Sequence, residues 1–205
     1  MSATTPSASP SRGPADHAVR DQIIEAASEH FSQYGYAKTT VSDLAKAIGF
    51  SKAYIYKFFD SKQAIGEAIC AKTLTAIVAA VEEAVAAATT PTEKLRRMFN
   101  VLVTTGVSLH FNDRKLYDVA AYAAAERWPS VRVYCERITH LVAEIVREGR
   151  ESGEFERKTP LDETVHAIDL VVQPYVNPLL LQYNLDVAEE APARLSGLVL
   201  RSLAR

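Results

Sequence analysis

Cysteine is scarce in this chain, because Cys70 and Cys135 are the only two among 205 residues. Their positions form no CxxC or CxxH spacing, so neither a disulfide framework nor a zinc site is indicated. We expect both thiols to be free and buried in the core, and we expect no metal and no cofactor. A thiol-based redox switch would instead require both side chains to be exposed and close together.

Long apolar runs are also missing. No run approaches the roughly 20 residues that a membrane-spanning helix requires, and the first 16 residues lack the apolar stretch of a secretory signal peptide. We therefore expect a cytoplasmic protein with no membrane partner. The composition, 48% hydrophobic and 23% charged residues, is ordinary for a globular protein that buries a core.

Sequence motifs of enzymes are missing as well. The chain contains no GxSxG, HExxH, Walker loop or dinucleotide fingerprint, and no close set of carboxylates and histidines. Their lack argues against an enzyme.

The segment from Thr40 to Lys62, TVSDLAKAIGFSKAYIYKFFDSK, predicts two short helices joined at Gly49. Thr40 is a good N-cap, and the apolar residues after it recur at three- and four-residue spacing on one buried face. Gly49 supplies the positive φ that ends a helix, and Ser51 caps a second helix that runs to about Phe59. A turn this short makes the helices cross steeply, which is the layout of a helix-turn-helix that enters DNA.

The second helix of this segment carries small, aromatic and basic residues on its start and outward faces: Lys52, Ala53, Tyr54, Tyr56 and Lys57. Between Lys38 and Lys62 there are five lysines and two acidic residues, a net charge of +3, whereas the whole chain has −2. A locally basic element on a mildly acidic protein is consistent with attraction to DNA phosphates.

Together with their upstream neighbours, these residues resemble the N-terminal signature of the tetracycline-repressor (TetR) family. The matching residues are Arg20, Ile23, Ala26, Ala27, Phe31, Gly35, Tyr36, Thr39, Thr40, Leu44, Ala45, Gly49, Ser51, Tyr56, Phe59 and Lys62. The resemblance implies a third helix that enters the major groove, with Tyr56 and Lys62 on phosphates. Two departures leave the motif intact but the operator sequence open: Ala53 stands where many members have glycine, and Phe58 where they have histidine.

We expect one set of residues to bind backbone phosphates and another to read base edges. The phosphate set is Thr39, Thr40, Tyr56, Lys57 and Lys62, and the base set is Lys52, Ala53 and Tyr54. Two recognition helices must lie about 34 to 36 Å apart to enter successive major grooves, so we expect a homodimer on a palindromic operator.

The chain as a whole is expected to be all-α, with about nine helices and no strand. A flexible tail of residues 1–15 precedes a three-helix DNA-binding domain of residues 16–63. Residues 64–205 then form a helical ligand-binding and dimerisation domain. A long helix from Ser61 to about Ala88 joins the two domains and is the expected transmitter of ligand binding.

The last quarter of the chain predicts two helices, which run from Thr159–Pro160 to about Tyr183 and from about Val187 to Leu203. The first is apolar on more than one side, so it must contact more than its own domain. We expect a homodimer through a four-helix bundle of these helices, residues about 160–204. Pro174 and Pro178 should bend or break the first helix, to shape either a pocket or the dimer interface.

Candidate pocket residues combine aromatic walls with a few polar groups, as pockets in helical bundles do. They are His110, Tyr117, Trp128, Tyr134, His166, Gln173, Tyr175 and Asn177. A plain core position is the alternative for each of them.

The resulting hypothesis is a ligand-responsive transcriptional regulator, a repressor that binds double-stranded operator DNA and is released by an unidentified small molecule. The alternative is a helical protein-interaction module that uses the helix-turn-helix for packing alone. That alternative leaves Lys52, Tyr54 and Lys57 without a role.

Overall fold

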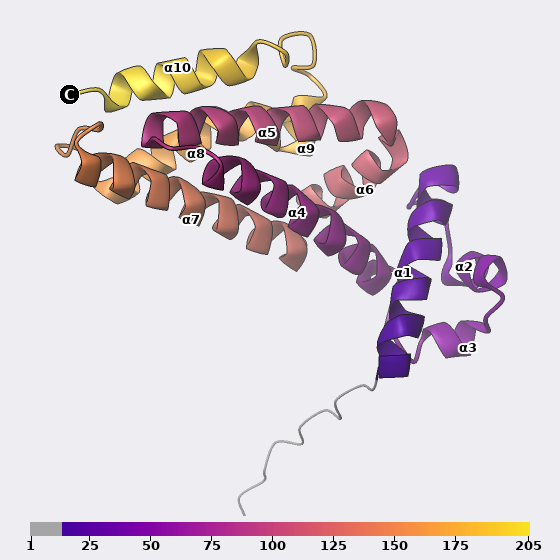
Figure 1. Ribbon diagram of the computed structural model, residues 1–205. Helices are drawn as coiled ribbons and strands as arrows, with labels where there is room; N and C mark the ends of the chain where they lie inside the picture. The colour runs from indigo at the N-terminus through magenta and orange to yellow at the C-terminus, as the bar shows by residue number, and fades with distance from the viewer. Residues whose placement is uncertain (1–13) are drawn as a thin grey trace, which may run out of the picture.

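The structure is a computed structural model that describes residues 14–205, and these form ten α-helices and no strand (Figure 1). The helices are α1 Pro14–Tyr34, α2 Val41–Ile48, α3 Lys52–Ile55, α4 Lys62–Ala86, α5 Pro91–Asn112, α6 Arg114–Ala125, α7 Pro129–Ser152, α8 Leu161–Val176, α9 Pro178–Leu181 and α10 Ala191–Leu203. The all-α prediction is confirmed. Residues 1–13 of the predicted tail lie outside the described residues, and α1 already begins at Pro14.

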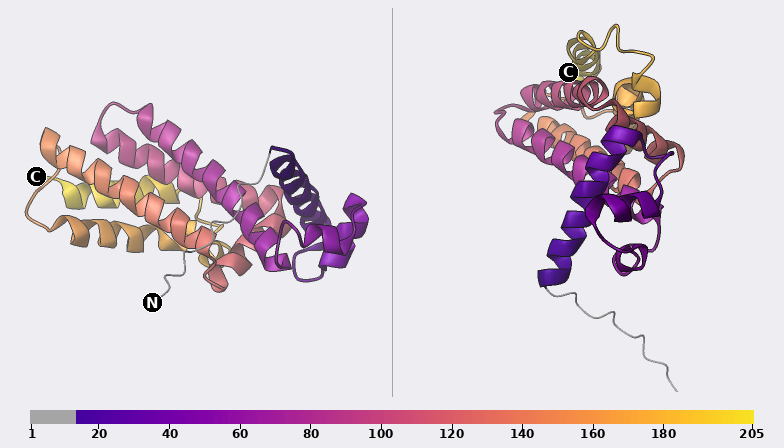
Figure 2. Two further views of the ribbon diagram at one scale, coloured as in Figure 1. Left: turned by 90° about the horizontal axis from the view of Figure 1, so that it is seen from below. Right: turned by 90° about the vertical axis from the view of Figure 1, so that its right-hand side faces the viewer.

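The helices form a small bundle of α1–α3 at one end and a larger bundle beyond it, with α4 running from one into the other (Figures 1 and 2). The core of the small bundle includes Phe31 and Ile55, both fully buried. The same core continues past residue 63 into Val119 and Ala123 of α6 and Trp128 at the start of α7. The two predicted domains therefore share packing.

The larger bundle has its own core between α4, α5, α7, α8 and α10, with Phe99, Val142 and Val199 buried in it. A smaller cluster around Tyr117 and Leu181 lies where α5, α6 and α9 meet. The C-terminal helix α10 runs along α5, at the opposite side of that helix from α7 (Figure 1).

Within residues 14–205, α4 is the one helix long and apolar enough to cross a membrane by length and composition. The expectation that no apolar run approaches this length is therefore wrong. α4 nevertheless packs against α1, α5, α6 and α7. It also forms an ion pair with each of two neighbours: Lys72 Nζ lies 2.7 Å from Glu25 Oε2 on α1, and Arg137 Nη2 of α7 lies 2.6 Å from Glu82 Oε1. Here α4 is a bundle helix.

The region after α7 departs from the predicted bounds. Pro160, not Thr159, is the N-cap of α8, and it offers no side-chain hydrogen bond. The helix keeps Pro174 inside it but ends at Val176, with Asn177 as its C-cap, because Pro178 cannot continue the amide ladder. The Asn177 side chain then accepts from the amide of Leu179, 2.9 Å away, and starts the short α9. This predicted break is confirmed and accounts for the tenth helix.

The last helix begins at Ala191, four residues later than predicted. Residues 182–190 form turns instead, and Pro192 lies in the first turn of α10. Proline is favoured at this place because the first amides of a helix have no partner. The apolar spacing from Val187 onward resembles that of a helix, so it predicted a start that is too early.

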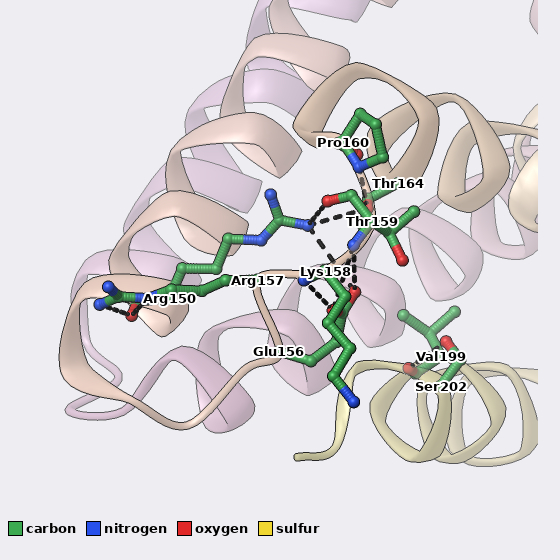
Figure 3. A network of polar contacts seen from close by, with 9 residues as sticks. All are labelled: Arg150, Glu156, Arg157, Lys158, Thr159, Pro160, Thr164, Val199 and Ser202. Carbon is green, nitrogen blue, oxygen red and sulfur yellow. Dashed lines mark hydrogen bonds and ion pairs between the residues drawn. The ribbon is translucent and has the colours of Figure 1, made fainter.

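A polar network closes the far end of the larger bundle, where α7 turns into α8 (Figure 3). Arg150 donates to the carbonyl of Thr159 at 2.8 Å and to the hydroxyl of Thr164 at 3.0 Å. Arg157 caps the C-terminus of α7 through its Nε, 2.7 Å from the Arg150 carbonyl oxygen. The Glu156 amide donates to the carbonyl of Leu203, so the same network anchors α10.

Candidate nucleic-acid interface and internal cavity

The first helix of the predicted helix-turn-helix, α2, is capped as the sequence predicts. The amide of Asp43 donates to the Thr40 hydroxyl at 3.2 Å, and the Thr40 amide donates back to the Asp43 carboxylate at 2.9 Å. This reciprocal capping box satisfies two amides that a helix start leaves open. The bonds from Thr40 hold the pKa of Asp43 below its ordinary value. The Thr40 side chain is therefore occupied at the helix start.

The turn between the two short helices is made by Gly49, whose φ of 77° lies in the left-handed region. Its amide donates to the carbonyl of Lys46, and the Phe50 amide reaches Ala45 at 2.9 Å. Ser51 then caps α3 by accepting from the Tyr54 amide at 3.1 Å. The predicted joint is present at these residues.

The recognition helix is shorter than predicted. Regular α-helix ends at Ile55, and the backbone continues as turns to Phe59, with bonds such as Phe58 N to Ile55 O at 2.9 Å. Ile55 and Phe59 are both buried, which anchors the turns on the core. The prediction of one continuous helix to about Phe59 was wrong, because the segment after Ile55 forms turns.

The outward face of α3 and its following turn carries the predicted reading residues. Lys52, Ala53, Tyr56 and Lys57 are exposed, and Tyr54 is half-buried. The Tyr54 ring packs edge-on between Phe50 and Phe58, at centroid distances of 5.1 and 5.4 Å. Because its ring is held from both sides, Tyr54 presents a fixed edge next to Lys57, whose Nζ lies 5.4 Å from the ring centroid.

Two predicted phosphate ligands, Thr39 and Lys62, make side-chain hydrogen bonds within the protein. The Thr39 side chain is only 2% exposed, and its hydroxyl donates to the Gly35 carbonyl at 2.8 Å. Lys62 donates to the carbonyl of Tyr36 at 3.0 Å and lies 4.3 Å from that ring's centroid. Partial burial lowers the pKa of Lys62. Contacts with DNA by any of these residues remain predictions.

An internal cavity of about 160 Å³ lies in the larger bundle, bordered by α4, α5, α6, α7 and the α8–α9 break. Its lining is Cys70, Thr73, Leu74, Ile77, Leu102, Gly106, Leu109, Leu116, Tyr117, Val119, Ala120, Ala124, Val131, Tyr134, Cys135, Gln173, Val176, Asn177, Pro178 and Leu181. Cys70 and Val119 also belong to the core of the small bundle, so the cavity directly borders that bundle.

Four of the eight predicted pocket residues line this cavity: Tyr117, Tyr134, Gln173 and Asn177. The other four lie elsewhere. Trp128 is buried in the core of the small bundle, and Tyr175 packs on the cluster at α9. His166 is exposed on α8.

His110, the last of the four, lies beside the cavity and not in its wall. Its ring packs edge-on against Tyr117 at 4.7 Å, and Arg114 Nη1 lies 2.9 Å from its Nε2. Burial and the Arg114 charge lower the pKa of His110, which favours the neutral ring. His110 thus supports the position of Tyr117.

Both cysteines line the cavity, which sequence reasoning missed. Cys70 is buried, as expected, but Cys135 is exposed, so the expectation of two buried thiols was wrong. Burial raises the pKa of the Cys70 thiol, and desolvation of the sulfur at the cavity wall, with the charges of Asp169 and Glu136, raises that of Cys135; both shifts disfavour the reactive thiolate. Small residues of α5 and α6 were missed too, because alanine and glycine carry no signal for a pocket until a helix faces them.

Helix α6 connects the cavity to the small bundle. It lines the cavity with one face and contacts α1 with another. The Ser32 hydroxyl on α1 donates to the Asp113 carboxylate at 2.7 Å, and Lys115 donates to the backbone carbonyl of Gln33. The helix is therefore attached to α1 at its start.

An aromatic group attaches the other end of α6. Tyr36, in the turn after α1, contacts Tyr122 of α6 at 5.2 Å and Trp128 at 5.7 Å between ring centroids. Burial, with the nearby Tyr122 and Glu67, raises the pKa of Tyr36 to about 12. Arg127, just before Trp128, has a φ of 53°, a left-handed conformation that side chains disfavour.

Comparison with known proteins identifies the chain. Residues 23–69 match the model of bacterial regulatory proteins of the tetR family, and residues 91–195 match that of tetracyclin repressor-like C-terminal domains. The chain belongs to the TetR family. The predicted helix-turn-helix domain followed by a helical C-terminal domain is confirmed by this membership.

Two curated relatives of this TetR family member match parts of the chain. The biofilm operon icaADBC HTH-type negative transcriptional regulator IcaR of Staphylococcus aureus (strain Newman) is 45% identical over 49 residues, 24% of this chain and 26% of IcaR. The HTH-type transcriptional repressor KstR2 of Mycolicibacterium smegmatis is 30% identical over 99 residues, 48% of this chain and 45% of KstR2. The chain thus spans about a quarter and about half of these relatives.

A solved structure extends the likeness over most of the chain. Thermus thermophilus FadR, a TetR-family transcriptional repressor in complex with lauroyl-CoA, is 25% identical, with a TM-score of 0.65. The match covers 91% of this chain and 96% of that one. These TetR relatives are transcriptional regulators and not enzymes. They support a ligand-responsive DNA-binding regulator and do not favour the packing-only alternative.

Proposed function

We propose that this protein is a cytoplasmic transcriptional repressor that binds a palindromic operator as a homodimer and is released when a small molecule enters the cavity. The observation that carries the proposal is the shared packing: Cys70 and Val119 belong both to the cavity wall and to the core behind the reading helices. A ligand in this cavity therefore presses on the support of the DNA-binding surface. The printed names of IcaR and KstR2 describe negative regulation, which supports repression.

On the DNA side, Lys52, Ala53 and Tyr54 are assigned to base edges because they lie at the exposed start of α3. Tyr56, Lys57 and Lys62 bind backbone phosphates. Thr40 contributes by capping α2, the helix that supports the recognition helix. The buried Thr39 positions the turn that carries Tyr36.

Release requires a ligand that favours a conformation with wrongly spaced reading helices, since equal affinity for both shapes changes no population. The resting cavity of about 160 Å³ is smaller than the roughly 300 to 1,000 Å³ of ordinary ligand pockets. A ligand larger than a benzene ring therefore either widens it or extends out of its open side. The walls that move are α4 and α6, and both continue into the small bundle.

The displacement reaches DNA through α6 as well as through the long helix α4. The Ser32–Asp113 bond ties the start of α6 to α1, and the Tyr36–Tyr122 contact ties its other end to the turn after α1. Tyr36 in turn holds Lys62 through its carbonyl. A coupling of about 1 to 3 kcal/mol through these contacts would lower operator affinity roughly 5- to 150-fold.

Dimerisation is proposed through α8 and α10. A groove of about 450 Å³ runs between these helices, with Ile168, Val171 and Val199 in its walls. Leu198 of α10 also lines the groove and is 52% exposed, and Leu170 of α8 is 59% exposed. Two copies that pack α8 and α10 into a four-helix bundle cover these side chains.

The first experiment is fluorescence anisotropy of the purified full chain with the DNA upstream of its own gene. Binding is expected to be specific and to weaken by orders of magnitude as salt rises from about 50 to 200 mM, because phosphate contacts dominate affinity. Equal affinity for the upstream fragment and for scrambled DNA of the same composition would reject the proposal.

Two variants test the division of labour on the DNA. Tyr54→Ala should relax sequence preference, whereas Lys62→Ala should weaken every sequence by a similar factor. Tyr34→Ala is the matched control, since Tyr34 is an exposed tyrosine of the same bundle at the end of α1. An equal loss of sequence preference in Tyr54→Ala and Lys62→Ala would contradict the assignment.

A further inference from the structure

The cavity wall carries no charged side chain. Of the lining residues, the polar ones are cysteine, threonine, tyrosine, glutamine and asparagine, and the others are apolar or glycine. An ionised ligand group inside the wall would lose water without gaining an opposite charge, which is strongly unfavourable. The wall therefore selects against charge.

The free hydrogen-bonding groups of the wall lie at one end of the cavity. Within residues 14–205, neither the Tyr134 hydroxyl nor the side-chain amide of Gln173 makes a hydrogen bond. The side-chain oxygen of Asn177 accepts from the Leu179 amide, and its side-chain nitrogen has no acceptor. Burial raises the pKa of Tyr134, so its hydroxyl remains a donor.

These groups come together because α7 and α8 run side by side in opposite directions (Figure 2). The Thr139 hydroxyl of α7 donates to the Asp169 carboxylate of α8 at 2.8 Å. Four residues back along α7 and four residues forward along α8, this register brings Cys135 beside Gln173, with Asn177 one turn beyond on the same face. Tyr134 precedes Cys135.

We propose that the effector is an uncharged, largely apolar molecule with one carbonyl-type acceptor, bound by the donors of Tyr134, Gln173 and Asn177. This rests on the proposed function, because it assigns the ligand class of the same cavity. The apolar body lies among Leu74, Ile77 and Leu102 of α4 and α5. The source of the acceptor is a free ester or ketone, or the carbonyl of an acyl thioester whose charged part remains outside.

Charged groups near the cavity lie behind its wall. Asp169 is held by Thr139, and His166 is exposed one turn before it. On the opposite side, Arg114 packs on His110 and on the outer face of Tyr117, 5.5 Å from that ring's centroid. Asp169, His166, Arg114 and His110 are all outside the lining.

The test compares neutral and anionic probes of equal length: methyl laurate against laurate, and a neutral steroid ketone against its hemisuccinate. Binding is measured by the melting shift of the full chain and by release of operator DNA. At least one neutral probe should bind, and its anionic partner should bind at least about tenfold more weakly at pH 8. The apparent affinity of laurate should rise about tenfold for each unit that pH falls from 8 to 6, because only the protonated acid enters. Methyl laurate has no titratable group, so the pH dependence of its binding measures the effect of titrating the protein itself.

A variant tests the polar end. Tyr134→Phe should weaken binding of the neutral probe roughly three- to tenfold, the value of one hydrogen bond. Tyr183→Phe is the matched control, because Tyr183 is exposed and outside the lining.

Lauroyl-CoA distinguishes the two sources. If methyl laurate binds and lauroyl-CoA binds more tightly, the source is a thioester; if the ester alone binds, it is a free neutral molecule. Tighter binding of laurate or of a lipophilic cation than of the neutral probes would overturn the ligand class, as would binding of lauroyl-CoA alone. Failure of every probe with operator binding intact would overturn it too, while the DNA-binding function would stand.

Discussion

At the scale of single residues, Gly66 of α4 lies directly against the Trp128 and Tyr36 rings in the core of the small bundle. A methyl group on its α-carbon would lie 2.8 Å from Trp128 Cη2 and 2.9 Å from Tyr36 Cε2, and both rings are held in the core. We predict that Gly66→Ala destabilises the protein by about 1 to 3 kcal/mol through overpacking, measured by urea unfolding. Because Tyr36 holds Lys62, operator affinity should fall as well.

Gly197→Ala in α10 is the control for this variant. The new methyl group there would meet only the flexible end of Arg201, at 3.4 Å. Replacing a helical glycine then stabilises by about 0.5 to 1 kcal/mol. A Gly66→Ala protein as stable as the wild type would mean that the rings move aside freely and transmit nothing.

At the scale of elements, two helices begin with the same device in different domains. Thr40 caps α2 and Thr90 caps α5, each by accepting from the amide three residues later. We predict that Thr40→Ala and Thr90→Ala each cost about 1 kcal/mol of unfolding free energy. Thr40→Ala alone should also weaken operator binding in the anisotropy assay, because α2 supports the recognition helix. Equal operator affinity for the two variants would contradict this role of α2.

The α2 cap also gives a pH dependence with a defined sign. The pKa of Asp43 is lowered by its bonds from Thr40, so the folded state prefers the carboxylate. Its contribution is complete above the ordinary value of 3.8 and is lost as pH falls through the lower folded value. Thr40→Ala should flatten this acid-side loss of stability, measured by melting temperature against pH.

At the scale of the whole molecule, the reading helices act only as a pair. We predict that Leu198→Glu makes the protein monomeric in analytical ultracentrifugation, because it places a charge in the apolar face of α8 and α10. Operator affinity should fall, and the slope of log affinity against log salt should halve with the number of phosphate contacts.

Phe111→Glu is the matched control for this prediction. Phe111 is 68% exposed, more than Leu198, but it lies at the end of α5 outside the α8–α10 groove. It should leave the dimer intact. A monomer from Phe111→Glu, or an intact dimer from Leu198→Glu, would place the interface elsewhere.

The sequence by itself determined the local devices of this protein. Thr40, Gly49 and Ser51 act within a few residues of themselves, so their caps and turn could be read without a fold. The same holds for the break at Pro178, because proline removes an amide wherever it stands. The exposed row on α3 follows from helical spacing.

Tertiary structure decided what lies between elements. Whether Tyr134 or Trp128 faces the cavity depends on how α7 rotates against α4 and α6, and buried aromatic residues look alike in sequence. The packing of α6 on both bundles, the contact of Tyr36 with Lys62 and the exposure of Cys135 all depend on how residues far apart in the chain are placed in space. Such contacts arise from the packing of whole helices, which spacing along a single helix does not encode.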